Sequence, residues 1–151
     1  MTQIYVDADA CPVKEEIYRV AIRCDLQVTI VANSWMRIPD DTRVKLVVVG
    51  DALDAADDWI AEHAAKYDIV VTADIPLAGR CVGEGAYVIN PRGKILDDAC
   101  IGDVVATRDL MTDLREAGIA SGGPPPFSKK DRSKFLQGLD RLVQQSKRDS
   151  A

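Results

Sequence analysis

Aspartates follow three of the short apolar segments in this chain of 151 residues. The segments at residues 4–6, 44–49 and 69–72 are followed by Asp7 and Asp9, by Asp51 and Asp54, and by Asp74. Carboxylate oxygens gathered in one place are the ligands that Mg²⁺ and Mn²⁺ prefer. A single aspartate after a strand more often caps the next helix, so the metal interpretation depends on the whole set.

The elements that must position these side chains alternate between β-branched runs and helical patterns. Strands are predicted at 4–6, 26–32, 44–49, 69–72 and 87–90, and helices at 12–23, 52–66, 77–82 and 98–117. This alternation is typical of an α/β fold with a mainly parallel sheet, whose strands end at a common edge. The aspartates are therefore expected to meet at that edge. The continuous apolar run at 46–49 predicts that its strand is central.

Asp57 is unusual for its place in the predicted helix at 52–66. At about 100° per residue, the apolar side chains of this helix form one buried stripe, with Asp57 at its rim and Asp58 pointing away. The stripe consists of Leu53, Ala56, Ile60 and Ala64. A carboxylate beside the core costs free energy unless a cation pairs with it. The pairing cation is expected to be a metal ion or an arginine such as Arg108.

Composition disfavours several other kinds of site. The chain has one histidine, His63, and four scattered cysteines, Cys11, Cys24, Cys81 and Cys100. This pattern predicts free thiols and speaks against a zinc site or a Ser-His-Asp triad. With no apolar run of membrane-spanning length and no basic, apolar leader, we expect a cytoplasmic protein without a membrane partner.

Charge and turn residues divide the chain into three parts. We predict an α/β domain at 1–120, a Gly/Pro-rich linker at 121–127 and a basic C-terminal helix with its tail at 128–151, packed on the same domain. Residues 1–123 hold 12 Lys/Arg and 21 Asp/Glu, whereas residues 124–151 hold 7 and 3. An acidic body with a basic tail argues against simple electrostatic binding of nucleic acid by the body.

The C-terminal helix is predicted to begin at a capping pair, Ser128 and Asp131. Apolar residues then recur at helical spacing, namely Phe135, Leu136, Leu139, Leu142 and Val143. Such a stripe must dock on the body or on a partner chain, so a homodimer through this helix is one expectation.

Several segments together resemble the bacterial YaiI/YqxD family across nearly the whole chain. They are residues 7–14 (DADACPVK), residues 54–57 (DAAD), residues 72–78 (TADIPLA), Arg92-Gly93, Gly123-Pro124, Phe127 and Asp131. The family is similar to the PIN-domain-like superfamily, which implies a three-layer PIN-like fold. In that superfamily, acids at the strand ends hold Mg²⁺ or Mn²⁺ in nucleases.

The resemblance implies a role for individual residues of this chain. Asp7 matches the acid of the first strand, Asp57 the acid of the helix and Asp74 the acid of the "TxD" motif, and these three are the expected metal ligands. Ile75 follows Asp74 where the superfamily carries a further acid nearby, so Asp9 is expected to take that place as ligand or base. Asp7, Asp9, Asp57 and Asp74 are thus the expected catalytic residues.

The function predicted on this basis is hydrolysis of phosphodiester bonds in RNA by a Mg²⁺- or Mn²⁺-dependent nuclease. Lys14 and Arg92 are expected to hold phosphate oxygens of the substrate. The alternative is a non-catalytic RNA- or protein-binding module that keeps the same fold, and a phosphatase acting on small phosphoesters is third. Carboxylates crowded into one metal site also predict that at least one of them titrates above the usual range of aspartate when no metal is bound.

Overall fold

Strands and helices alternate through most of the described chain, as the sequence predicts. The computed structural model describes residues 2–9, 11–50, 52, 54–97 and 127–150. In chain order the elements are β1 (Gln3–Asp7), α1 (Lys14–Cys24), β2 (Gln27–Ala32), β3 (Val44–Val48), α2 (Ala55–His63), β4 (Ile69–Val71), α3 (Ile75–Gly83), β5 (Tyr87–Ile89), β6 (Ile95–Leu96) and α5 (Lys129–Ser150). The helix predicted at 98–117 and all but the last residue of the linker at 121–127 lie outside the described residues.

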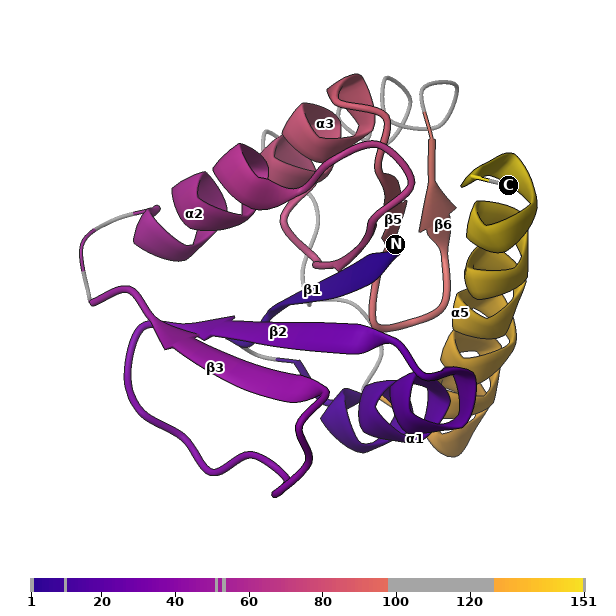
Figure 1. Cartoon of the computed structure of the whole chain (residues 1–151), viewed down its shortest axis with the longest axis horizontal. Coiled ribbons are helices and arrows are strands. Elements are labelled where there is room, and N and C mark those ends of the chain that lie inside the picture. The colour runs from indigo at the N-terminus through magenta and orange to yellow at the C-terminus, as the bar shows by residue number, and fades with distance from the viewer. Residues whose placement is uncertain (1, 10, 51, 53, 98–126, 151) are drawn as a thin grey trace, which may run out of the picture.

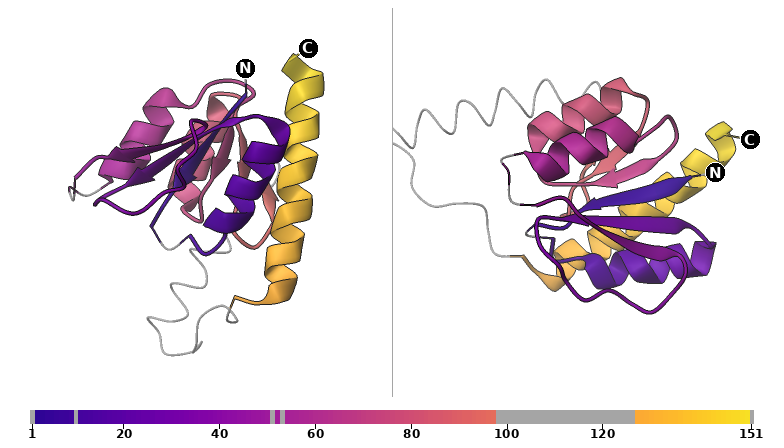
Figure 2. Two further views of the ribbon diagram at one scale, coloured as in Figure 1. Left: turned by 60° about the horizontal axis from the view of Figure 1, so that its bottom comes forward. Right: turned by 60° about the vertical axis from the view of Figure 1, so that its left-hand side comes forward.

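One six-stranded sheet, in the order β3-β2-β1-β4-β5-β6, forms the middle layer. All neighbouring strands are parallel except β5 and β6. Helices α1 and α5 cover one face, and α2 and α3 cover the other (Figures 1 and 2). The prediction of an α/β fold with a mainly parallel sheet is therefore confirmed.

The strand order reverses between β1 and β4. The chain first builds outward from β1 to β2 and β3, and then returns to place β4 on the other side of β1. Strands on both sides and helices on both faces bury the middle of β1, where Ile4 and Val6 are fully buried. A reversal of this kind opens a crevice outside the carboxyl ends of the two strands that flank it.

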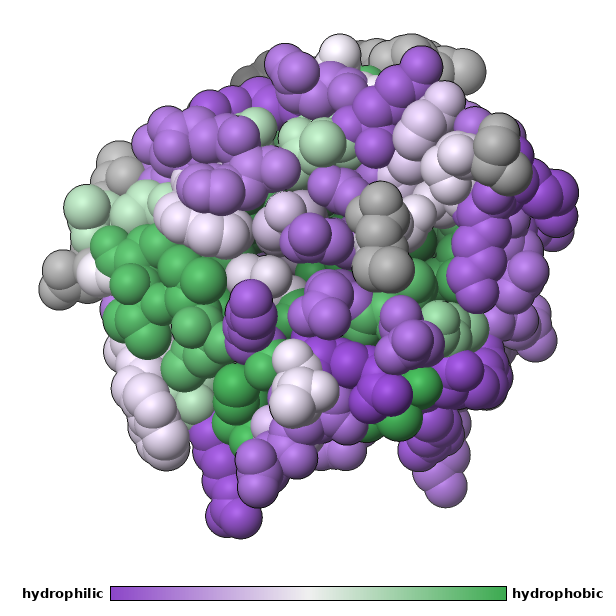
Figure 3. Space-filling view, in the orientation of Figure 1, coloured by the Kyte–Doolittle hydropathy of each residue, from purple (hydrophilic) through white to green (hydrophobic). Residues whose placement is uncertain are grey.

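The prediction that the apolar run at 46–49 forms a central strand is wrong. β3 is an edge strand of the sheet, and Val48 is 49% exposed. Figure 3 shows hydrophobic surface gathered over this side of the molecule. An apolar run indicates that a strand has cover on its faces, but strand order is decided by the crossover connections, which hydropathy does not encode.

Helix α5 begins and packs as the sequence predicts. The backbone N–H of Ser128 donates to the Asp131 carboxylate, and the backbone N–H of Asp131 donates to the Ser128 hydroxyl, over 3.0 and 3.3 Å. The stripe of α5 packs on α1 and β5 in the same chain, and its members Phe135, Leu139, Leu142 and Val143 are buried. Because this chain itself buries the stripe, it is not available for the expected homodimer. No described helix has both the length and the apolarity needed to cross a bilayer.

The described cysteines are free thiols, as predicted. Cys11, Cys24 and Cys81 form no disulfide, and Cys100 lies outside the described residues. Burial raises the pKa of Cys81 to about 11, and burial also raises the pKa of Cys11. Both side chains therefore stay protonated and serve as small apolar groups rather than as nucleophiles.

A candidate active site at the carboxyl ends of the strands

A cavity of about 320 Å³ opens where the strand order reverses. Five aspartates and an asparagine supply its polar groups, and small apolar residues supply the rest. The described lining residues are Asp7, Asp9, Asn33, Ala52, Asp54, Ala55, Ala56, Asp57 and Asp74. The structure thus brings together all four predicted catalytic residues. None of the described lining residues carries a positive charge.

Each predicted catalytic residue reaches the cavity from its own position in the fold. Asp7 is the last residue of β1, and Asp9 follows two residues later. Asp74 lies three residues after the end of β4 and immediately before α3. Asp57 lies in the first turn of α2. Asp51, the remaining aspartate predicted at a strand end, lies outside the described residues.

Helix capping, the ordinary explanation for an aspartate after a strand, holds for Asp74 but not for Asp54. The Asp74 carboxylate accepts a hydrogen bond of 2.9 Å from the backbone N–H of Leu77 and so caps α3. Asp54 precedes α2 in the left-handed region, with φ of 62°, and its side chain makes no capping hydrogen bond. Asp74 therefore both begins a helix and lines the cavity.

Thr72 joins the ends of β1 and β4 inside this site. Its hydroxyl donates to the Asp7 carboxylate over 3.1 Å and accepts from the backbone N–H of Asp74 over 3.0 Å. Val6 pairs with Val71 in the sheet, so the next position along each strand places Asp7 beside Thr72. Because Thr72 is 1% exposed, its hydroxyl has no competing water, and it fixes the orientation of the Asp7 carboxylate.

Asn33 holds Asp9 from the neighbouring strand. Its side-chain amide donates to the Asp9 carboxylate over 3.0 Å. Neither Asn33 nor Thr72 is among the site residues predicted from the sequence. Asn33 follows β2 directly, so the rule that selected the aspartates, a polar residue just after a strand, would have found it.

Burial, together with the neighbouring carboxylates, raises the pKa of Asp57 to about 6. Burial is the largest cause, followed by repulsion from Asp74 and Asp7 and by a hydrogen bond between the Asp57 and Asp74 side chains. Burial likewise raises the pKa of Asp7, partly offset by the hydrogen bond from Thr72. These shifts agree with the expectation that crowded carboxylates titrate above the usual range of aspartate.

The surroundings of Asp57 match the helix geometry predicted for it. Ala56 and Ile60 are buried on the core side of α2, whereas Asp58 points away and pairs with Arg80 over 2.8 Å. The hydrogen bond of Asp57 connects it to another carboxyl, that of Asp74. Arg108, the arginine considered as its partner, lies outside the described residues.

The donor atoms of the cavity suit a hard divalent cation. Carboxylate and amide oxygens are what Mg²⁺ and Mn²⁺ prefer, and the described lining offers no thiol or imidazole. In the part of the chain that the structure describes, however, no three His, Cys, Asp or Glu side chains form a ready-made metal-binding group. A cation would therefore have to draw together carboxylates that repel one another without it.

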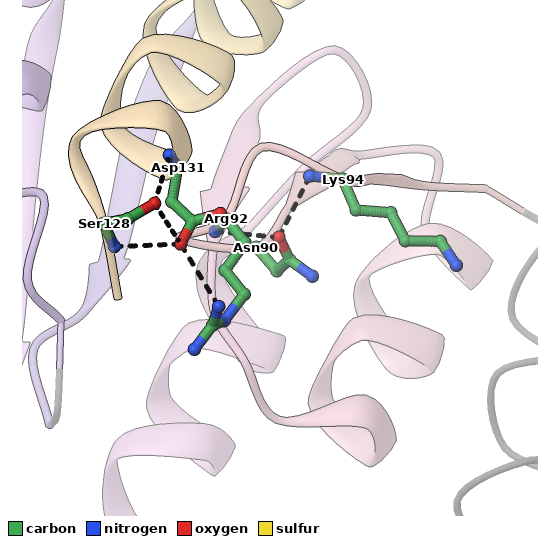
Figure 4. A network of polar contacts seen from close by, with 5 residues as sticks. All are labelled: Asn90, Arg92, Lys94, Ser128 and Asp131. Atoms are coloured by element: carbon green, nitrogen blue, oxygen red, sulfur yellow. Dashed lines mark hydrogen bonds and ion pairs between the residues drawn. The ribbon is translucent and has the colours of Figure 1, made fainter. Parts of the chain in front are cut away.

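The two predicted phosphate-binding residues do not line this cavity. The Lys14 ammonium donates to the backbone carbonyl of Cys11 over 3.2 Å. The Arg92 guanidinium pairs with Asp131 over 3.2 Å, which links the turn between β5 and β6 to the start of α5 (Figure 4). Arg92 lines a neighbouring cavity together with Ala73, the residue before Asp74.

Comparison with known proteins identifies the family. A sequence profile described as "Uncharacterized BCR, YaiI/YqxD family" matches residues 5–145. A UPF0178 protein of Azorhizobium caulinodans is 57% identical over 145 residues, which cover 96% of this chain and 91% of that protein. A UPF0178 protein of Paramagnetospirillum magneticum is 53% identical over 148 residues, which cover 98% of each. No solved structure matches the chain. The chain therefore belongs to the YaiI/YqxD family.

Proposed function

We propose that this protein is a Mg²⁺- or Mn²⁺-dependent nuclease that hydrolyses phosphodiester bonds in RNA in the cytoplasm. One observation carries the proposal: Asp7 and Asp9 from the end of β1, Asp57 from α2 and Asp74 from the start of α3 line one cavity at the point where the strand order reverses. Crevices at that point are where open α/β sheets bind their ligands. Capping alone accounts for only one of these aspartates, Asp74.

Asp7, Asp57 and Asp74 are the residues that would hold the cation. Thr72 keeps the Asp7 carboxylate in one orientation, and the cap on α3 does the same for Asp74. Asp57 supplies a carboxyl that releases its proton close to neutral pH, because its pKa is raised to about 6. When bound, a divalent cation lowers the pKa of a bound water and neutralises charge on the phosphate.

Asp9 is suited to a different task from that of the three ligands. It is exposed at the mouth of the cavity, and Asn33 fixes one of its oxygens. A carboxylate held in this way accepts a hydrogen bond from an attacking water and orients that water toward the phosphorus atom.

The second candidate function is a non-catalytic RNA-binding module, and one observation favours it. The described residues include no ready-made group of three metal-binding side chains. A protein that binds RNA without turnover needs no such group, whereas a nuclease of this kind has to assemble one around its cation.

Incubation of the full chain with a labelled single-stranded RNA, in EDTA and then in Mg²⁺ or Mn²⁺, tests the proposal. We expect cleavage that requires the cation and is abolished in Asp57→Asn. Asp58→Asn is the matched control, since Asp58 is the next residue of α2 but pairs with Arg80 outside the cavity. RNA binding without cleavage in either cation would instead establish the binding module. Hydrolysis of a chromogenic phosphomonoester but not of RNA would show a phosphatase.

A further inference from the structure

A second cavity, of about 330 Å³, lies next to the aspartate cavity. Its lining is more apolar and includes an aromatic ring and a guanidinium group. The residues are Pro12, Ala73, Asn90, Pro91, Arg92 and Phe127. Ala73 immediately precedes Asp74, so the two cavities are both lined by the segment that follows β4. We call this second site the aromatic cavity.

The ring of Phe127 is held in place from the side of α5. The Arg132 guanidinium lies over the ring, 5.0 Å from its centroid, and also donates to Glu16 and to the backbone carbonyl of Pro12. Arg132 is therefore engaged within the fold rather than available to a ligand. A fixed aromatic ring beside a guanidinium group is the combination on which nucleobases stack in single-stranded complexes.

A third cavity, of about 350 Å³, lies between α5 and the segment from Gly93 to Ile95. Its described lining residues are Gly93, Ile95, Lys134, Gln137, Gly138 and Arg141, with two positive charges and no acid among them. Gly93 directly follows Arg92, which lines the aromatic cavity. We call this third site the basic groove.

Two glycines shape the basic groove. A Cβ on Gly93 would come within 2.5 Å of the Lys134 backbone, and a Cβ on Gly138 would lie 2.7 Å from the Ile89 side chain. The turn between β5 and β6 thus lies directly against α5. Lys134 and Arg141 are seven residues apart, so they stand about two helical turns apart on the same side of α5, beside this contact.

We propose that the aromatic cavity and the basic groove together bind the part of a single-stranded polynucleotide that flanks the bond to be cut. A base occupies the aromatic cavity beside Phe127, and backbone phosphates contact Lys134 and Arg141. The aromatic cavity is related to each of the other two by a pair of adjacent residues. Ala73 lines the aromatic cavity and Asp74 the acidic one, and Arg92 lines the aromatic cavity and Gly93 the basic groove. This proposal rests on the proposed function in one respect, namely that the bond next to the bound segment is cut; the binding itself does not depend on it.

The charge distribution of the chain supports this choice of ligand. Residues 1–123 carry 12 Lys/Arg against 21 Asp/Glu, so most of the surface repels a polyanion. A small phosphoester needs only the acidic cavity, whereas a polynucleotide also needs a basic surface nearby to hold its further phosphates. The basic groove on α5 provides that surface.

Fluorescence anisotropy in EDTA tests binding separately from cleavage. The full chain should bind a labelled single-stranded oligonucleotide more tightly than a dinucleotide, because only the longer ligand spans the groove. Replacing both cations in Lys134→Glu/Arg141→Glu should weaken binding of the oligonucleotide at least about tenfold and reduce the slope of log affinity against log salt by about 1.4. Phe127→Leu should weaken binding about tenfold at every salt concentration, because a stacked base is lost.

Lys147→Glu/Arg148→Glu is the matched control, with the same change of charge on the same helix. Lys147 lies beside Thr2 and Leu26, at the opposite end of α5 from Ser128 and Arg92. We expect this control to bind as the parent does. Equal weakening by both double variants would show a general effect of net charge, and unchanged binding in the Lys134/Arg141 variant would show that the groove is unused. Either result would overturn the proposal.

Cleavage assays on the same variants separate this inference from the proposed function. Groove-dependent binding without cleavage in Mg²⁺ or Mn²⁺ would leave the binding site standing and remove the nuclease. Cation-dependent cleavage that is unchanged in the Lys134, Arg141 and Phe127 variants would support the nuclease and remove the proposed binding site.

Discussion

Replacing Asp57 with asparagine should make the metal-free protein more stable at neutral pH. The pKa of Asp57 rises from an ordinary 3.8 to about 6, through burial and the repulsion of Asp74 and Asp7. A shift of this size costs the folded state about 3 kcal/mol at pH 7, since one pKa unit corresponds to about 1.4 kcal/mol. Solvent reaches Asp57 and screens part of the repulsion, so we expect a gain of about 1–2 kcal/mol in Asp57→Asn.

The pH dependence of this gain has a definite sign. Below its unfolded pKa, Asp57 is protonated in both the folded and the unfolded protein and imposes no penalty. The penalty grows as the pH rises from 3.8 to about 6, because the unfolded chain releases the proton first. The parent and Asp57→Asn should therefore have similar stability at pH 4 and differ fully at pH 7.

Urea unfolding of both proteins in EDTA, at several values between pH 4 and pH 7, measures the difference. Asp58→Asn is the control, and it should lose at most about 0.5 kcal/mol through its exposed pair with Arg80, with no comparable gain as the pH rises. Adding Mn²⁺ at about 100 times its Kd should stabilise the parent by about 2.7 kcal/mol and Asp57→Asn by much less.

A loss of stability in Asp57→Asn would refute this reasoning. If a buried arginine such as Arg108 pairs with Asp57, removing the carboxylate leaves that cation unpaired and costs about 3–5 kcal/mol at pH 7 in EDTA. Asp57 would then be a structural residue, and the nuclease proposal would lose one of its three ligands.

Two further predictions concern how α5 is attached, and both are measured by urea unfolding. Gly138→Ala should cost about 1–3 kcal/mol through overpacking, and Gly93→Ala should cost more, because its φ of +91° and the nearby backbone of α5 leave no room to adjust. Gly83→Ala, with nothing near its Cβ, should be close to neutral, and equal losses at all three glycines would contradict the packing described for α5. Arg132→Met should cost about 2 kcal/mol, because it leaves the buried Glu16 carboxylate without its cation. Glu16→Gln should cost less, because no charge is then left unpaired in the core. A larger loss in Glu16→Gln than in Arg132→Met would show that Arg132 does not act through Glu16.

The catalytic candidates could be predicted from sequence because they depend on a local rule. An aspartate that follows a β-branched run marks the end of a strand, and parallel strands all end at one edge. Asp7 and Asp74 follow this rule directly, and Asp57 follows from helical periodicity. The same rule applied to Asn33 would have found the partner of Asp9.

Other features depend on which strands become neighbours, and the sequence does not encode this locally. Thr72 reaches Asp7 only because β4 pairs with β1, across a chain separation of 65 residues. The position of β3 at the sheet edge follows from the same strand order. Lys14, predicted to hold a phosphate oxygen, lies in the first turn of α1, but its ammonium donates to the Cys11 carbonyl and does not line the aspartate cavity.

Arg92 shows a further kind of difference between sequence and structure. The sequence predicts that Arg92 holds a phosphate oxygen, whereas the structure pairs its guanidinium with Asp131 at the start of α5, from a distant part of the chain. Contacts between a turn and a helix that follows 39 residues later arise from tertiary packing, and no periodicity predicts them.

The position of α5 also has a consequence for how the protein is made. Its 22 residues come last in the described chain, yet Phe135, Leu139, Leu142 and Val143 complete the core formed by α1 and one face of the sheet. During synthesis the part of that face that α5 covers stays exposed after β1 to β6 have left the ribosome, although α1 already covers the rest of it and α2 and α3 cover the opposite face. The nascent chain therefore completes this core only after α5 has emerged, and a ribosome stalled before residue 135 carries an unfinished, aggregation-prone protein.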